Sequence, residues 1–293
     1  MSAKSRMGDP SSPGGAVHAE PGAHRTRPHP QTRTVRAGGV PIGDGGFVVL
    51  AGPCSIESRP QFEAIASFVH EQGAAMLRGG IFKLRTKPSS FQGLGEEGYE
   101  IVRAVREITG MPMVAEITDP RQIDALSELV DVFQVGTRNM YNYALLKELG
   151  LLRKPVLLKR GFSALLDEWL HAAEYVLMGG NEDVILCERG IRTFEPRMRN
   201  TLDLAAVAWV KRHSHLPVIV DPSHGTGRPE LIEPMTLAAA AAGADGVLIE
   251  VHPEPENALS DGHQAVDFEG FGRIMEKLRP LLTALGRSLT PSA

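Results

Sequence analysis

The chain has 293 residues, of which 42% are hydrophobic and 23% charged, and its formal net charge is −4. This composition supplies enough apolar side chains for a large core and excludes a fully disordered or fibrous protein. The slight acidic excess argues against a domain whose main task is to bind nucleic acid or an anionic membrane surface.

Two cysteines, Cys54 and Cys187, are too few for a disulfide framework and fit a reducing compartment. The sequence has no run of 18 apolar residues, so it predicts no membrane span. The polar residues that follow Arg6 do not form the apolar segment of a secretory signal. We therefore expect a soluble cytoplasmic protein that binds neither nucleic acid nor membranes.

Residues 1–38 are rich in Pro, Gly, His and Arg, with only scattered aliphatic residues, which predicts a disordered tail. The folded domain is expected to span residues 39–288. At its start, Val40–Phe47 contains the turn Gly43–Gly46 and is expected to form a small hairpin over the floor of the domain.

From Phe47 onward, short apolar runs alternate with segments of helical periodicity. The runs lack polar alternation, which is typical of parallel strands buried on both faces. The predicted strands are residues 48–51, 75–77, 113–117, 132–135, 156–159, 184–187, 218–220 and 247–251. The predicted helices are residues 60–71, 98–109, 120–129, 143–149, 165–178, 201–213, 229–242 and 268–285.

Eight β/α units in about 250 residues match the size of a (β/α)8 barrel, or TIM barrel. The alternative is a doubly wound open sheet, which usually has a glycine-rich phosphate-binding turn after its first strand. Here that turn reads Gly52-Pro-Cys-Ser55 and lacks the G-x-G-x-x-G pattern. We therefore favour a single α/β barrel.

In such a barrel, the chemistry is expected at the C-terminal ends of the strands, where the connecting loops converge. One group of residues at these ends combines a thiol, an imidazole and two carboxylates. That mixture suits a divalent transition metal such as Mn, Fe, Co or Zn. The group consists of Cys54, His224, Glu250 and Asp261.

A second group at the strand ends is cationic. A guanidinium group can donate two parallel hydrogen bonds to the oxygens of a phosphate or a carboxylate, so this group of residues predicts an anionic substrate. One member, Lys159, could instead act as a Schiff-base nucleophile. The group consists of Arg78, Lys83, Arg85, Arg138, Lys159, Arg189 and Arg192.

From about residue 40 to 285, the sequence resembles the type I beta branch of the 3-deoxy-7-phosphoheptulonate (DAHP) synthases. Long and specific motifs carry the resemblance. They are Ala51–Glu57, Arg78–Lys83, Ser90–Gly95, Pro155–Gly161, Ile185–Glu195, Arg199–Asp203, Val220–Gly225, Ile249–Pro253 and Leu259–Gly262.

The resemblance implies an aldol-like condensation of phosphoenolpyruvate with erythrose 4-phosphate, which releases phosphate in the first step of the shikimate pathway. By similarity, Cys54, His224, Glu250 and Asp261 match the ligands of one divalent metal ion. The phosphoenolpyruvate contacts match Arg78, Lys83, Arg138, Lys159 and Arg189, with Arg192 beside them. The aldose-phosphate contacts match Arg85 and Thr86.

The resemblance also implies three catalytic residues. Lys83 would move a proton, Glu116 would orient water, and His224 is the third.

The acceptor motif departs from the family pattern. The family usually reads Lys-Pro-Arg-Thr-Ser, whereas this chain reads Lys83-Leu-Arg-Thr-Lys87. Leu84 lacks the fixed φ of proline, and Lys87 adds a cation beside the acceptor site. An alternative function is therefore the same phosphoenolpyruvate chemistry on a different aldose phosphate in a specialised pathway.

Three other interpretations remain open: a metal-free Schiff-base aldolase that uses Lys159, a synthase of 3-deoxy-octulosonate 8-phosphate, and a degenerate barrel that binds another enzyme such as a chorismate mutase. By resemblance we expect a homo-oligomer. The first 40 residues are too few and too polar for an added regulatory domain, so we expect no domain-based feedback.

Overall fold

The computed structural model describes residues 31–85 and 87–292. Residues 1–30, which form most of the expected disordered tail, lie outside this part of the chain, as does Thr86. In the described part, no helix is long and apolar enough to cross a membrane.

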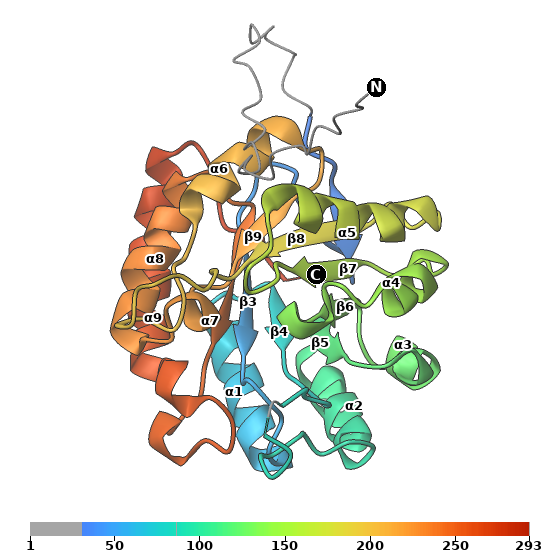
Figure 1. Cartoon of the computed structure of the whole chain (residues 1–293). Coiled ribbons are helices and arrows are strands. Elements are labelled where there is room, and N and C mark those ends of the chain that lie inside the picture. The colour runs from blue at the N-terminus through green and yellow to red at the C-terminus, as the bar shows by residue number, and fades with distance from the viewer. Residues whose placement is uncertain (1–30, 86, 293) are drawn as a thin grey trace, which may run out of the picture.

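Eight parallel strands form a closed barrel in the order β10-β3-β4-β5-β6-β7-β8-β9 (Figure 1). This confirms the predicted TIM barrel and excludes the open sheet. Two strands at opposite ends of the sequence complete the closure, because β10 pairs with β3 from Gly246↔Val48 to Glu250↔Gly52. The strands are β3 (Val48–Gly52), β4 (Met76–Arg78), β5 (Met113–Ile117), β6 (Val132–Val135), β7 (Val156–Lys159), β8 (Val184–Glu188), β9 (Val218–Val220) and β10 (Gly246–Glu250).

Helices surround the barrel, as Figure 1 shows. All eight predicted helices are present, although the segment predicted at 120–129 divides into a 3-10 turn and the short α3. A further short helix, α7, follows β9. The helices are α1 (Arg59–Glu71), α2 (Glu97–Thr109), α3 (Ile123–Ser127), α4 (Tyr143–Gly150), α5 (Leu166–Met178), α6 (Leu204–His213), α7 (Pro222–Thr226), α8 (Pro229–Ala241) and α9 (Phe268–Ala284), with 3-10 turns η1 (Pro120–Gln122), η2 (Thr137–Asn139), η3 (Pro255–Asn257) and η4 (Gly262–Gln264).

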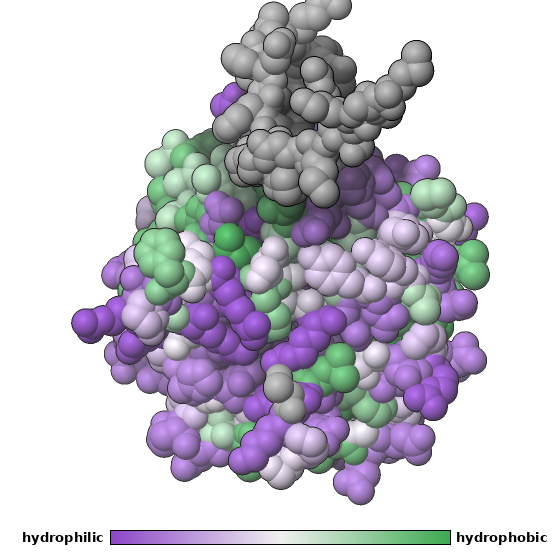
Figure 2. Space-filling view, in the orientation of Figure 1, coloured by the Kyte–Doolittle hydropathy of each residue, from purple (hydrophilic) through white to green (hydrophobic). Residues whose placement is uncertain are grey.

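The buried apolar residues form two layers, because side chains alternate across each strand. In β3, Val49 and Ala51 belong to the outer layer, which also contains the inward faces of the helices. Val48 and Leu50 belong to the inner layer, which fills the barrel. The polar faces of the helices remain outside, and Figure 2 shows hydrophilic side chains over most of the surface in view.

A hairpin of β1 (Val35–Ala37) and β2 (Val40–Ile42) packs on the inner layer of the barrel. The sequence predicted a hairpin at this end of the barrel, but the turn was wrongly assigned to Gly43–Gly46. The chain turns instead at Gly38 and Gly39, whose φ angles of 54° and 89° suit a tight two-residue turn. Val35 and Ala37, which the sequence assigned to the disordered tail, are fully buried parts of this hairpin.

Replacing Ile42 by alanine is expected to lower the free energy of unfolding by about 2–4 kcal/mol, because its buried side chain fills the floor of the barrel. The matched control is Ile108→Ala on α2, where the side chain is 61% exposed and the change should stay below about 0.5 kcal/mol. Urea unfolding measures both values, and equal losses would contradict the packing of the hairpin.

Candidate active site

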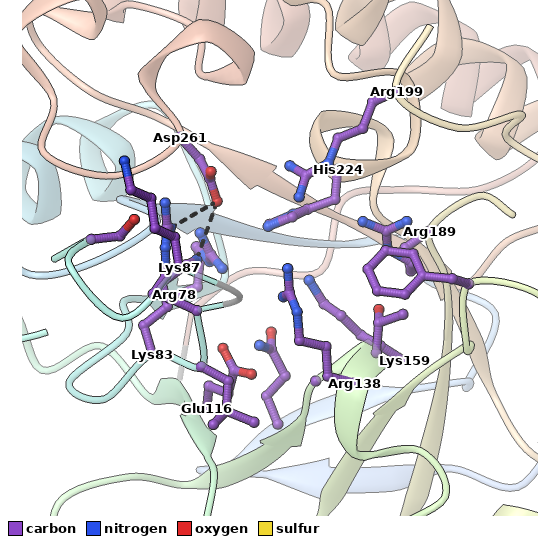
Figure 3. A pocket seen from close by; sticks show the side chains of 17 residues that line it. Arg78, Lys83, Lys87, Glu116, Arg138, Lys159, Arg189, Arg199, His224 and Asp261 are labelled. Carbon is purple, nitrogen blue, oxygen red and sulfur yellow. Dashed lines mark ion pairs between the residues drawn. The ribbon is translucent and has the colours of Figure 1, made fainter. Parts of the chain in front are cut away.

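The C-terminal ends of the barrel strands surround a pocket of about 270 Å³ (Figure 3). Among the described residues, two carboxylates line it, Glu116 of β5 and Asp261 in the loop before η4. The lining cations outnumber them: Arg78, Lys83, Arg85, Lys87, Arg138, Lys159, Arg189 and Arg199. The pocket therefore has a strong positive charge and fits an anionic ligand.

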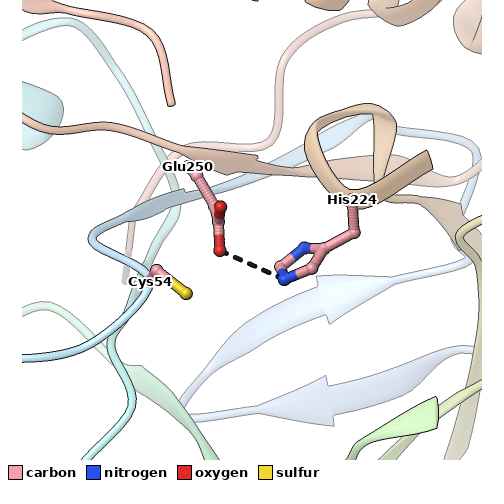
Figure 4. A group of neighbouring side chains, drawn as sticks. All are labelled: Cys54, His224 and Glu250. Carbon is pink, nitrogen blue, oxygen red and sulfur yellow. Dashed lines mark ion pairs between the residues drawn. The ribbon is translucent and has the colours of Figure 1, made fainter. Parts of the chain in front are cut away.

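Three donor side chains meet beside the pocket, and one of them, His224, belongs to its lining (Figure 4). Cys54 follows β3, His224 lies on α7 and Glu250 ends β10, and their donor atoms lie within 4.8 Å of one another. We call these three residues the metal corner. The Nε2 atom of His224 is 3.3 Å from Oε1 of Glu250. Donors that share a divalent transition metal stand about 3–4 Å apart, so the residues fit such an ion.

Asp261 lies next to the metal corner without belonging to the group of three. Its Oδ2 atom accepts a hydrogen bond from the Cys54 thiol at 3.3 Å. Among the described residues, Asp261 alone has a positive φ without being glycine, at 53°. Asp tolerates this left-handed conformation better than most side chains do, and the loop holds the carboxylate in the lining of the pocket.

Buried ionic contacts set the protonation of the metal corner. Arg78 Nη1 donates to Glu250 Oε1 at 2.8 Å, and Lys83 Nζ donates to Cys54 Sγ. Burial alone would raise the pKa of Glu250, but His224 and Arg78 lower it to about 2. Burial lowers the pKa of His224 to about 4, against the opposing effect of Asp221. At neutral pH the carboxylate is charged and the imidazole neutral, as metal ligands require.

The Cys54 thiol has to lose its proton to become a metal ligand. Burial, together with the charge of Glu250, raises the pKa of Cys54 to about 12. The thiol therefore keeps its proton at neutral pH in the absence of metal, and a bound metal would replace that proton.

Asp221 connects the metal corner with the cationic side of the pocket. Its Oδ2 atom lies 2.7 Å from His224 Nδ1 and 2.5 Å from Lys159 Nζ. Burial would raise the pKa of this carboxyl, but His224 and Lys159 hold it well below its usual range. The imidazole has Nδ1 beside Asp221 and Nε2 toward Glu250, and a carboxylate near the second ring nitrogen is common for metal-binding histidines.

Arg189 is a buried cation with no ion-pair partner among the described residues. Only 2% of it is exposed, and burial lowers its pKa to about 10, so it is charged at neutral pH. Its Nε atom has no hydrogen-bond partner. A buried, unneutralised guanidinium in a pocket indicates a site for an anion.

Most of the predicted site residues meet in this arrangement. The pocket contains all the predicted substrate contacts except Arg192, whose side chain is exposed outside the lining, and Thr86, which lies outside the described residues. Glu116 lies against Gly136, where a Cβ atom would come within 2.1 Å of the carboxylate oxygen Oε1, so this glycine leaves room for the carboxylate.

Arg199 and Gln264 were not among the predicted site residues, although Arg199 begins one of the motifs that carry the family resemblance. Arg199 lines the pocket and donates a hydrogen bond to Oε1 of Gln264. The buried Gln264 in turn donates to Oε2 of Glu250 at 2.6 Å. Arg199 lies in the loop after β8 and Gln264 ends η4, both several residues from the strand ends, so no strand-end pattern selects them.

Comparisons with known proteins agree with this geometry. Residues 26–284 match the model of the DAHP synthetase I family. Over 258 residues the chain is 48% identical to the phospho-2-dehydro-3-deoxyheptonate aldolase of Thermotoga maritima, which covers 88% of this chain and 76% of that protein. It is 30% identical over 273 residues to the 2-dehydro-3-deoxyphosphooctonate aldolase of Geobacter sulfurreducens. That alignment covers 85% of this chain and 98% of the relative.

Solved structures show the same similarity. The crystal structure of the Thermotoga maritima phospho-2-dehydro-3-deoxyheptonate aldolase (DAHP synthase) aligns with a TM-score of 0.86 and 48% identity, covering 89% of this chain and 77% of the other. A truncated form of the 3-deoxy-D-arabino-heptulosonate 7-phosphate synthase from the same organism aligns with a TM-score of 0.83 and 45% identity, covering 89% and 96%.

Replacing Cys54 by alanine is expected to weaken Zn²⁺ or Mn²⁺ binding by about 100-fold or more, because the substitution removes one ligand of the metal corner. Cys187→Ala is the matched control, since Cys187 is also buried but lies in the inner layer of the barrel. Equilibrium dialysis of the metal-free protein measures both affinities. The metal corner would be wrongly identified if the two variants bound metal equally well.

Proposed function

The chain belongs to the DAHP synthetase I family, and on that premise we propose that it condenses phosphoenolpyruvate with erythrose 4-phosphate. The products are 3-deoxy-7-phosphoheptulonate and phosphate, and the reaction uses one divalent metal ion. The observation that carries the proposal is that His224 belongs both to the metal corner and to the lining of the cationic pocket.

The cationic side of the pocket is the proposed site of phosphoenolpyruvate. Its phosphate and carboxylate together carry a high negative charge, which Arg138, Lys159 and Arg189 would neutralise. Arg78 ends β4 between this side and the metal corner, where its guanidinium already holds Glu250. These contacts would fix the reacting C3 atom of the enol in one orientation, which lowers the entropic part of the barrier.

The metal corner is the proposed site of aldehyde activation. Cys54, His224 and Glu250 would hold the ion, with Asp261 as the fourth ligand, and the bound metal would supply Lewis-acid polarisation of the aldehyde oxygen. Lys83 lies next to Cys54, with Nζ 3.5 Å from Oδ2 of Asp261. From that place it could deliver a proton to the oxygen that becomes an alkoxide.

Water must add to C2 of the enol after the new carbon–carbon bond forms and before phosphate departs. Glu116 lines the same pocket as Lys83 and Arg138. We propose that this carboxylate orients the water and receives its proton.

The acceptor end of the pocket supports a second candidate, the same chemistry with a different aldose phosphate. Leu84, Arg85, Lys87 and Ser90 line that end. Arg85 donates to Ser260 Oγ at 2.9 Å and lies 3.6 Å from Asp261 Oδ2. Lys87 adds a further positive charge near the expected acceptor phosphate, so the preferred sugar has to be measured.

The ion pair of Lys159 argues against the Schiff-base alternative. Its Nζ atom lies 2.5 Å from Oδ2 of the fully buried Asp221. An ammonium in such a pair is not nucleophilic, and it suits a lysine that binds an anion. Cytoplasmic location, homo-oligomer formation and a chorismate mutase partner stay predictions.

We expect purified enzyme with Mn²⁺ to release phosphate from phosphoenolpyruvate when erythrose 4-phosphate is added, and a chelator to stop the reaction. A panel of other aldose phosphates, assayed in the same way, decides between the two candidates. If turnover is fastest with another aldose phosphate, that sugar and not erythrose 4-phosphate is the acceptor. Turnover that survives the chelator would contradict the role of the metal.

Replacing Arg189 by glutamine is expected to raise the KM for phosphoenolpyruvate by about 10- to 100-fold, because a charge-assisted contact to the substrate is lost. Arg197→Gln is the matched control, since this exposed arginine lies in the same loop but outside the pocket lining, and its effect should be several-fold smaller. Steady-state kinetics with both substrates varied measure the two effects. An unchanged KM in the Arg189 variant would contradict the proposed phosphate site.

A further inference from the structure

Phe162 is an aromatic residue in the lining of a highly charged pocket. It lies in the loop that follows β7, and β7 stands between β6 and β8 in the barrel. Arg138 follows β6 and Arg189 follows β8, and Figure 3 labels both arginines. The loop that carries Phe162 therefore lies between the two loops that carry these arginines.

Three guanidinium groups surround this one ring. Their central carbon atoms lie 4.4 Å from the ring centroid for Arg192, 4.9 Å for Arg189 and 5.5 Å for Arg138. All three distances are within the range of a cation–π contact, in which the negative face of the ring attracts the cation. The backbone N–H of Arg192 also donates to the carbonyl of Phe162 at 2.7 Å, which ties the two loops together.

Carboxylates do not offset the charges of two of these arginines. Among the described residues, neither Arg189 nor Arg192 has an ion-pair partner within 4.0 Å. The Arg189 side chain donates one long hydrogen bond, from Nη1 to the carbonyl of Gly190 at 3.3 Å. The ring of Phe162 is therefore a principal contact that orients this guanidinium.

An aromatic ring suits this position better than a carboxylate does. A carboxylate would neutralise the arginines and compete with an anionic substrate for the same N–H groups. A ring attracts the cations weakly through its face and leaves the N–H edges of the guanidinium groups available. It also reduces the cost of holding like charges close together before an anion arrives.

We propose that Phe162 is a positioning residue that holds the arginines of the anion site ready for the phosphate of phosphoenolpyruvate. The inference rests on the proposed function and deepens it, because it assigns the preorganisation of the anion site to one side chain. Phe162 itself makes no hydrogen bond to substrate and acts through Arg138 and Arg189.

Binding and kinetics of three variants test the proposal. Phe162→Leu keeps an apolar side chain without the negative face of the ring, Phe162→Met is a second variant of this kind, and Phe162→Tyr keeps the ring. Calorimetric titration of each Mn²⁺-loaded variant with phosphoenolpyruvate is expected to show binding about 10- to 30-fold weaker for the leucine and methionine variants. The tyrosine variant should stay within about threefold of the parent protein.

Kinetics separate positioning from a general loss of structure. In the leucine variant, the KM for phosphoenolpyruvate should rise while the kcat and the KM for the aldose phosphate change by less than about twofold. The control is Phe68→Leu, which removes an aromatic ring stacked on Phe268 with a centroid distance of 4.2 Å, outside the pocket lining. Thermal unfolding of every variant confirms that it is folded.

The possible results are distinct. Weak binding by the leucine and methionine variants with rescue by tyrosine supports the proposal. Parent-like binding by the leucine or methionine variant overturns it, and so does equally weak binding by all three folded variants. If the parent protein itself binds no phosphoenolpyruvate, both the proposed function and the inference about Phe162 are wrong. If the parent protein and the variants bind phosphoenolpyruvate equally well, only the inference about Phe162 is wrong.

Discussion

The pairing of β3 with β10 closes the barrel, and both the core and the site depend on this closure. The pairing runs from Gly246↔Val48 to Glu250↔Gly52. It requires glycine at position 246, where a Cβ atom would lie 2.2 Å from the carbonyl oxygen of Val48. Because β3 leads directly to Cys54, the pairing brings the thiol next to Glu250, almost 200 residues further along the chain.

Closure also concentrates charge at one end of the barrel, and burial makes unpaired charge costly. Arg78 and Lys159 are buried in pairs with Glu250 and Asp221, which keep these cations in place without substrate. Arg189 lacks such a partner among the described residues. The ion pairs thus fix the positions of Arg78 and Lys159. The positive charge of Arg189 attracts an anion, and binding an anion would stabilise this arginine.

The sequence predicted the barrel strands to within one residue at each end, because apolar runs buried on both faces have an unambiguous pattern. It also predicted that most of the proposed site residues come together, since parallel strands bring their C-terminal ends to one end of the barrel. It could not predict contacts that depend on loop conformation. Arg199 reaches the pocket because the loop after β8 folds back through the Ile191–Thr201 bridge, and Phe162 resembles an ordinary apolar loop residue.

A crystal structure of the protein soaked with Mn²⁺ and phosphoenolpyruvate tests most directly whether the metal corner and the adjoining cationic pocket bind the two together. We expect an anomalous Mn peak within bonding distance of Cys54, His224 and Glu250, with the phosphate between Arg138 and Arg189. A metal peak elsewhere, or a phosphate bound outside this pocket, would contradict this expectation.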